Sequence, residues 1–405
     1  MKDKQVSPYR WVILLTTVPV IIATEMMWLT FSPISSMAES FYNVSSMAVT
    51  MLATSYMLMF IVFCIPASYV IDRFGFRTSL LIGALMTGVF GLTRALFADS
   101  FAMVTISQFL VAAGQPFLLN ITTKVAANWF PFRQRATAAG ILTMAQYLGF
   151  ALPMVLSPML TEAYGLPGTL KVIAAVGVIA SVVAILFSRE KPKVAPAGPA
   201  AEKEDFSLSA LKTLFTNKPY LLALVISFIS MGIFNTLLTL IETILMPRGI
   251  TSAQAGLIGA AFVLAGVLGA ILLPIVSDRR GRRIPLLLLA LSLLAPLYLG
   301  IALLKGFGLL VIFAGLAGFL IMGVAPIVFQ HSSEVAYPIQ EGTSLGMMLL
   351  MGQVSGVLFV FLFELASGSF GTVTVPLLCI VILTVLEIPL AAKMRESVLI
   401  GKNKS

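Results

Sequence analysis

The chain has 405 residues, of which 59% are apolar and only 11% are charged. A soluble domain carries about 25% charged residues, so this composition excludes an ordinary water-soluble protein. The formal net charge is +9, yet 22 of the 26 Lys and Arg residues fall in segments that would share one side of a membrane. This asymmetry follows the positive-inside rule. It predicts a lipid bilayer as partner and cytoplasmic termini, and it gives no support to nucleic-acid binding.

The hydropathy pattern predicts an all-α membrane protein with twelve transmembrane helices in two pseudo-symmetric six-helix bundles. Each apolar stretch reaches the roughly 20 residues that a spanning helix needs. The predicted bundles cover residues 1–188 and 218–405. The Pro- and charge-rich segment 189–217 predicts a cytoplasmic linker, with a short amphipathic helix at 206–215. The predicted spans are 11–38, 46–71, 78–97, 101–127, 134–160, 168–188, 219–246, 253–277, 284–304, 307–331, 342–368 and 372–393.

The two halves also carry the same motif. Asp72-Arg73-Phe74-Gly75-Phe76-Arg77 recurs 206 positions later as Asp278-Arg279-Arg280-Gly281-Arg282-Arg283, and residues 135–140 match 341–346 at the same offset. Repeated halves are typical of secondary transporters, which alternate access around a site near the membrane midplane. The sequence has no ATP-binding loop, dinucleotide motif or nucleophile–base set. It therefore predicts a transporter that is not an enzyme, needs no cofactor and functions as a monomer.

The charged motifs after the second and eighth spans predict a cytoplasmic latch. Glycine permits a tight turn, and arginine offers a fork of donors to a carboxylate of the other half. Asp72 is expected to accept hydrogen bonds at the N-terminus of an opposing helix. The loop after span 307–331 has acids but no Lys or Arg, so its acids are candidate partners of Arg73 or Arg77. Alternatively, these charges only set topology. The candidate gating residues are Asp72, Arg73, Arg77, Asp278, Arg279, Arg282, Glu334, Glu341 and Arg135.

Two residues of the first span indicate a binding site at membrane depth. Glu25 lies about 14 residues into the span, roughly 21 Å from its start, where an ionisable group usually faces a cavity or a partner. It is a candidate proton-coupling carboxylate or counter-charge for a cation. Trp28 follows one turn later, and a carboxylate beside an indole face suits an organic cation through cation–π contact. The alternative for both residues is helix packing.

Polar residues on other spans complete the candidate substrate site. Gln146 and Gln353 are pseudo-symmetric, each roughly 11 residues into its span and about 17 Å deep, near the midplane. They are candidates for hydrogen bonds to a substrate or, alternatively, to each other or another helix. Asn235, in the middle of span 219–246, is a further candidate contact. Glu242, near the outer end of that span, is either an entry acid or a solvated helix end.

Longer strings carry a family resemblance. They include Ser55-Tyr56-Met57-Leu58, Gln146-Tyr147-Leu148-Gly149 and the diagnostic run Glu334-Val335-Ala336-Tyr337-Pro338 leading to Glu341-Gly342-Thr343-Ser344. Over nearly all its spans the chain resembles the feline leukaemia virus subgroup C receptor-related family of the major facilitator superfamily. The resemblance implies transport of choline, ethanolamine or haem-like compounds, with an aromatic and two glutamines around a quaternary ammonium. The compact size and short loops favour a prokaryotic member.

Individual positions both match and depart from that family. Trp28, Gln146 and Gln353 match the positions that the resemblance assigns to the cation cradle. In span 219–246 the resembled family has an aromatic residue where this chain has Asn235. Glu25 and Glu242 also stand where relatives carry uncharged residues, so the substrate of this chain is expected to have diverged.

The sequence as a whole predicts a secondary active transporter of the plasma (inner) membrane. The expected substrate is a small amine or organic cation, choline- or ethanolamine-like, moved with protons as coupling ions. One alternative is a proton-driven efflux pump for hydrophobic compounds. Another is an organic-anion or haem transporter, which would need a cavity cation such as Lys124 or Arg94, both placed near helix ends. A non-transporting membrane sensor is the alternative outside transport.

Overall fold

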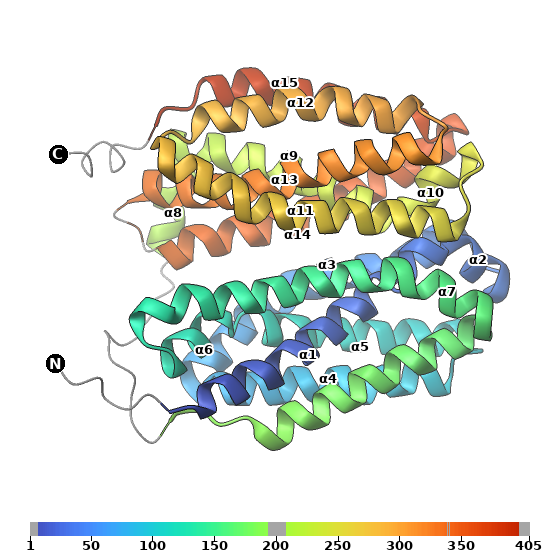
Figure 1. Ribbon diagram of the computed structural model, residues 1–405, viewed down its shortest axis with the longest axis horizontal. Coiled ribbons are helices and arrows are strands. Elements are labelled where there is room, and N and C mark those ends of the chain that lie inside the picture. Colours follow the sequence, from blue (N-terminus) through green and yellow to red (C-terminus); the bar gives the residue numbers. More distant parts are fainter. Residues whose placement is uncertain (1–6, 193–207, 338, 340, 397–405) are drawn as a thin grey trace. The chain divides into compact units, whose positions relative to one another are not determined.

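The computed structural model describes residues 7–192, 208–337, 339 and 341–396, and the regular structure of that part of the chain is entirely helical. The chain divides into two compact units, residues 1–203 and 204–405 (Figure 1). Eleven described helical runs are long and apolar enough to cross a membrane, and one of them, Thr137–Phe187, has 51 residues. A span takes roughly 20 residues, so that run is long enough for two crossings. The described helices thus account for the twelve predicted spans.

Unit 1 is built around two long helices. α1 (Tyr9–Leu29) packs along α7 (Phe132–Phe187), and α4 (Phe76–Leu96) packs against both α7 and α5 (Phe101–Leu119). The remaining elements are η1 (Ser32–Ile34), α2 (Ser35–Tyr42), α3 (Ser46–Phe74) and α6 (Thr122–Trp129). α3 packs on α5, so polar side chains of α1, α3, α4 and α5 can meet inside the unit.

Unit 2 repeats this organisation. α9 (Lys218–Thr239) packs on α14 (Glu341–Phe370), and α12 (Ile284–Leu303) packs on α15 (Thr374–Ala392). The other elements are α8 (Leu208–Thr216), α10 (Ile241–Leu245), η2 (Met246–Arg248), α11 (Ser252–Arg280) and α13 (Phe307–Ala336). α8 covers the described part of the predicted amphipathic helix, whereas residues 193–207 of the predicted linker lie outside the described residues.

The closest helix pair of unit 2 is α11 with α13. A Cβ atom added to Gly269 would collide with the Phe319 backbone, and one added to Gly318 would collide with the Phe262 backbone. Small residues allow helix backbones to approach in this way, and such packing is a main source of helix association in membranes. The two glycines therefore fix how these helices cross.

Helix breaks differ from the predicted spans, and backbone chemistry explains several of them. α1 ends at Leu29, and the chain reaches α2 through a short 3₁₀ turn that contains Pro33. α5 ends soon after Pro116, whose missing N–H removes a helical hydrogen bond. The loop expected between spans 134–160 and 168–188 is instead a kink at Gly165, with φ +71°. Glycine adopts this left-handed backbone without steric cost.

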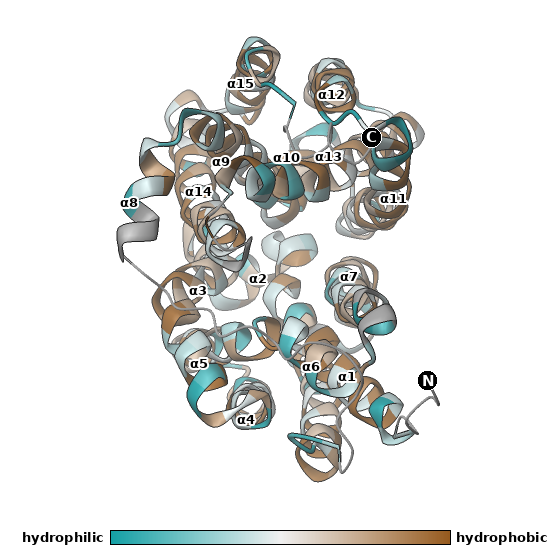
Figure 2. Ribbon diagram, turned by 90° about the vertical axis from the view of Figure 1, so that its left-hand side faces the viewer, coloured by the Kyte–Doolittle hydropathy of each residue, from teal (hydrophilic) through white to brown (hydrophobic). Residues whose placement is uncertain are grey.

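The distribution of polarity is that of a protein whose solvent is lipid. Leu15, Ile179 and Leu186 are each about two-thirds exposed, whereas Glu25 and Arg94 are fully buried. In the end-on view of Figure 2, hydrophobic colour covers many helical turns, and hydrophilic colour is prominent on linking segments and helix ends. Apolar side chains therefore face outward, while a polar network occupies the interior of unit 1.

Candidate functional site

Trp28 lies in an aromatic cluster inside unit 1. Its indole is 4% exposed, and its Nε1 donates a hydrogen bond to the Ala53 carbonyl over 2.9 Å. One side of the ring system stacks on Tyr56 of α3, with centroids 6.1 Å apart and planes at 21°. Phe150 of α7 meets the indole edge-on at 5.2 Å. The predicted free indole face is thus partly covered, and the aromatic surface available in unit 1 is a cluster of three rings rather than one tryptophan.

Glu25 is buried one turn before this cluster. It is 0% exposed, and both carboxylate oxygens accept hydrogen bonds from Gln115 Nε2 of α5, at 3.0 and 2.9 Å. Gly149 of α7 packs directly against the Glu25 side chain, where any larger residue would collide with it. In the described part of the chain, no ion pair reaches Glu25. A buried carboxylate without a cation is costly, so this acid needs a proton or a positively charged partner.

Two buried hydroxyl groups accompany Glu25. The Tyr56 hydroxyl and the Thr24 hydroxyl are both buried, and neither has a hydrogen-bond partner in the described part of the chain. Buried polar atoms are nearly always hydrogen-bonded, so such groups mark places where a water molecule or ligand atom fits. The region around Glu25 therefore has unused hydrogen-bonding capacity.

A second polar network, which the sequence interpretation missed, holds the end of α1. Arg94, considered above only as a cation near a helix end, is fully buried and donates to the Met27 carbonyl at 3.1 Å and to Gln108 Oε1 at 2.5 Å. Gln108 Nε2 donates to the same Met27 carbonyl at 3.0 Å. The sequence contains one sign of this network. Gln108 and Gln115 lie seven residues apart in an apolar span, which places both on one helix face.

The two predicted amides lie in different units. Gln146 on α7 and Gln353 on α14 are both half-buried, and neither has a hydrogen-bond partner among the described residues. Asn235 is 3% exposed, and its side-chain nitrogen donates to the Gly352 carbonyl at 3.4 Å. Asn235 therefore anchors the backbone next to Gln353, while the two glutamines retain free amides.

Glu242 does not lie at a solvated helix end. It is 1% exposed in α10, and the Ser252 hydroxyl at the start of α11 donates to its carboxylate. The alternative of a water-exposed acid is therefore wrong, because the carboxylate joins two helices inside unit 2.

The first charged motif makes its described contacts within unit 1. Asp72 forms an ion pair with Lys124 at 3.2 Å. The helix N-terminus after the motif is occupied by Glu190, which accepts from the backbone N–H of Phe76 at 3.3 Å and of Arg77 at 2.7 Å. Helix N-termini carry partial positive charge, which favours a carboxylate at this place.

Unit 2 repeats the same contact. Glu396 lies 206 residues after Glu190, and its Oε1 accepts from the backbone N–H of Arg283 and of Ile284, both at 2.9 Å. Glu334, proposed above as a partner of Arg73 or Arg77, pairs here with Arg283 at 2.6 Å. Each unit therefore ends with a carboxylate that binds the helix following the charged motif. We call these two contacts, Glu190 with α4 and Glu396 with α12, the carboxylate caps.

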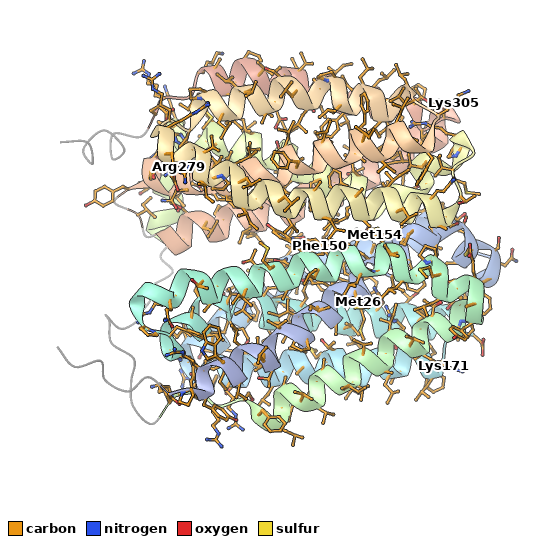
Figure 3. All side chains as sticks on the ribbon, in the orientation of Figure 1. Met26, Phe150, Met154, Lys171, Arg279 and Lys305 are labelled. Atoms are coloured by element: carbon orange, nitrogen blue, oxygen red, sulfur yellow. The ribbon has the colours of Figure 1, made fainter. Side chains whose placement is uncertain are left out.

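The other candidate gating residues make fewer contacts in the described part of the chain. Asp278, Arg279 and Arg282 are exposed, and among the described residues they form no ion pair. The Arg73 guanidinium bonds the Tyr69 hydroxyl at 3.1 Å, and Arg135 Nε donates to the Phe130 carbonyl at 3.4 Å. The side chain of Glu341 lies outside the described residues. Figure 3 places Arg279 at one end of unit 2 and Lys305 at the other.

Two repeated helical units with apolar surfaces, buried polar groups and charged motifs at one end define a multi-pass membrane transporter. The sequence profile of the Major Facilitator Superfamily matches residues 11–386, so the chain belongs to that superfamily. Among solved structures, a bacterial homologue of the human lysosomal transporter Spinster, inward-facing and unoccupied, matches with a TM-score of 0.70. The match has 17% identity and covers 96% of both chains, which supports the fold alone.

Sequence relatives confirm the family resemblance. The human choline/ethanolamine transporter FLVCR2 is 27% identical over 391 residues, which are 91% of this chain and 74% of that protein. The cat choline/ethanolamine transporter FLVCR1 is 27% identical over 388 residues, which are 90% and 68%. Solute carrier family 49 member A3 of Xenopus tropicalis is 26% identical over 382 residues, which are 90% and 79%.

Proposed function

We propose that the protein is a secondary active transporter for a small amine or organic cation of the choline or ethanolamine kind, with protons as coupling ions. The observation that carries the proposal is the aromatic cluster of Trp28, Tyr56 and Phe150 beside the buried, cation-free carboxylate of Glu25. Aromatic faces and a carboxylate together attract a quaternary ammonium. The names of the relatives as choline/ethanolamine transporters support the same substrate class.

The amides of Gln146 and Gln353 are proposed to bind polar groups of the substrate. Both are half-buried and have no described hydrogen-bond partner, so a substrate oxygen or nitrogen can use them. We propose that Asn235 and Glu242 support the substrate site by holding neighbouring helices in place. Their polar groups already form hydrogen bonds with Gly352 and Ser252. We further propose a plasma (inner) membrane location with cytoplasmic termini, and a monomer.

The arrangement gives less support to an organic-anion carrier. Such a carrier needs a cation that can face its substrate, and Arg94 has its guanidinium bonded to Met27 and Gln108. Lys124 is paired with Asp72 near a helix end. Neither cation is placed to receive an anion inside unit 1.

The test compares choline with its neutral carbon isostere as stabilising ligands of the purified protein. A ligand that binds the folded state raises its stability by about 2.7 kcal/mol at one hundred times Kd. We expect choline, and not the isostere, to raise the thermal unfolding midpoint of the wild type. Trp28→Ala should abolish the shift, and Trp28→Phe should keep part of it because an aromatic face remains.

Trp11→Ala is the matched control, because Trp11 lies on the same helix and is 41% exposed. It should leave the choline shift unchanged. Equal shifts with choline and the isostere would contradict recognition of the positive charge. A shift with organic anions or large hydrophobic compounds, and none with amines, would leave the fold assignment standing and remove the proposed substrate.

A further inference from the structure

Unit 2 buries an acid that the proposed substrate site does not use. Glu387 lies on the stripe of α15 that faces the neighbouring helices, together with Ile380 and Thr384, and only 1% of it is exposed. Leu386, the residue before it, points about 100° away around the helix and is 53% exposed. The Glu387 carboxyl group is therefore enclosed by protein and does not extend to water or lipid.

A hydroxyl group of another helix donates a hydrogen bond to this acid, and a second buried hydroxyl group lies on a further helix packed against α15. The Ser230 hydroxyl of α9 donates to Glu387 Oε1 over 2.9 Å. Tyr298 of α12 is 3% exposed, lies within electrostatic range of Glu387, and its hydroxyl has no hydrogen-bond partner in the described part of the chain. Such an unpaired buried hydroxyl is rare, and here it belongs to a helix that packs against α15 and interacts electrostatically with Glu387.

The neighbouring helices bring no cation to this acid. The titratable or charged residues on the helices packed closely against α15 are Tyr298 on α12, Lys218 and Tyr220 on α9, and Glu341 and Glu364 on α14. Lys218 is exposed and precedes Ser230 by twelve residues, about 18 Å along the helix. In the described part of the chain, Glu387 forms no ion pair.

The internal repeat indicates that the fold itself does not require this acid. At the offset of 206 residues, the equivalents of Ser230 and Glu387 in unit 1 are Thr24 and Ser181. Both are buried residues, yet neither has a carboxyl group. At this offset, a carboxyl group in unit 2 stands where unit 1 has a hydroxyl group.

We propose that Glu387, Ser230 and Tyr298 form a proton-binding site inside unit 2. Burial removes hydration from the carboxylate without supplying a cation, which favours the neutral form with one bound proton. In that form the carboxyl O–H is itself a donor, while Ser230 still donates to Oε1. After the proton leaves, the carboxylate keeps the Ser230 hydrogen bond, and the buried Tyr298 hydroxyl remains within its electrostatic field. The proton is the only group that moves, and no other reactant is needed.

Infrared spectroscopy of the protein in lipid bilayers tests this site directly, because neutral carboxylic acids and carboxylates have separate carbonyl bands. We expect the wild type at neutral pH to show neutral-acid absorption, of which Glu387→Gln removes one carboxyl equivalent. Glu162→Gln, which changes an exposed acid, should remove none. Equal neutral-acid absorption in wild type and the Glu387→Gln variant would overturn the proposal.

Two milder variants keep the test valid if Glu387→Gln does not fold. Tyr298→Phe and Ser230→Ala each remove one hydroxyl and should shift the frequency of the same band. The Ser230 variant removes the described hydrogen bond of the acid, and the Tyr298 variant removes a neighbouring dipole. Absence of any shift in both variants would also overturn the proposal. The measurement needs no substrate, so its result is independent of whether the protein carries amines.

Discussion

At the scale of single residues, the buried polar side chains of unit 1 form two hydrogen-bonded groups with different roles. Gln115 holds Glu25 with both hydrogen bonds on one amide nitrogen, whereas Arg94 and Gln108 hold the Met27 carbonyl next to Trp28. The first pair surrounds a group that can change its charge, and the second fixes the position of the indole. A charge change at Glu25 can therefore occur without loss of the contacts that hold the end of α1.

This separation leads to a prediction for Glu25→Gln. Glutamine keeps an acceptor oxygen for Gln115 but cannot take up or release a proton. In proteoliposomes we expect the variant to exchange labelled choline across the membrane. A pH gradient should no longer raise the internal choline concentration above the external one. Glu162→Gln, at an exposed position, should accumulate like the wild type. Gradient-driven accumulation by the Glu25→Gln variant would show that this acid is not the coupling group.

Sequence reasoning found part of this residue network and missed the rest for physical reasons. Glu25 and Trp28 were identifiable because charge and indole are rare inside an apolar span. Arg94 was considered only as a cation near a helix end, because it lies close to the end of span 78–97, but its side chain donates to the Met27 carbonyl inside unit 1. The stacking of Tyr56 on Trp28 depends on how two helices pack, and no local pattern predicts that.

At the scale of elements, the carboxylate caps join the last residues of each unit to a helix in its middle. Glu190 binds the start of α4, and Glu396 binds the start of α12, at positions related by the internal repeat. The repeat was visible in the charged motifs, but the caps were not predicted, because the capping acids lie more than 110 residues from the helices they bind. Helix breaks near Pro33 and Pro116 were missed because proline is tolerated inside many membrane helices.

The caps predict a local effect on helix stability. Replacing a capping side chain costs about 0.5–2 kcal/mol, so Glu190→Ala should destabilise the start of α4 and Glu396→Ala the start of α12 by this amount. Hydrogen exchange followed by mass spectrometry should show faster exchange of peptides at residues 76–79 in the first variant and 283–286 in the second. Each helix start should be unaffected by the other variant. Unchanged exchange at both starts would show that solvent replaces these contacts without cost.

At the scale of the whole molecule, the charges of the chain specify an orientation in the membrane. Exposed arginines of the second motif lie at one end of unit 2, and Lys305 lies at the other, between α12 and α13 (Figure 3). The twelve spans followed from the hydropathy alone, because length and apolarity decide whether a helix crosses a bilayer. The kink at Gly165, in contrast, required the backbone itself, since a loop and a kink between two spans have the same hydropathy.

The orientation can be tested with single cysteines in a variant from which Cys64 and Cys379 have been removed. Lys171→Cys and Lys305→Cys replace exposed residues that the positive-inside rule assigns to the outside, whereas Arg73→Cys and Lys212→Cys replace exposed residues assigned to the cytoplasm. A membrane-impermeant maleimide added to intact cells should label the first two variants, and it should label the second two only after permeabilisation. The cysteine-free variant measures background. Labelling of the second pair in intact cells would show that the predicted orientation is wrong. Loops of both units contribute to the charge bias, so the basic loops of both units must lie on the cytoplasmic side if the prediction holds.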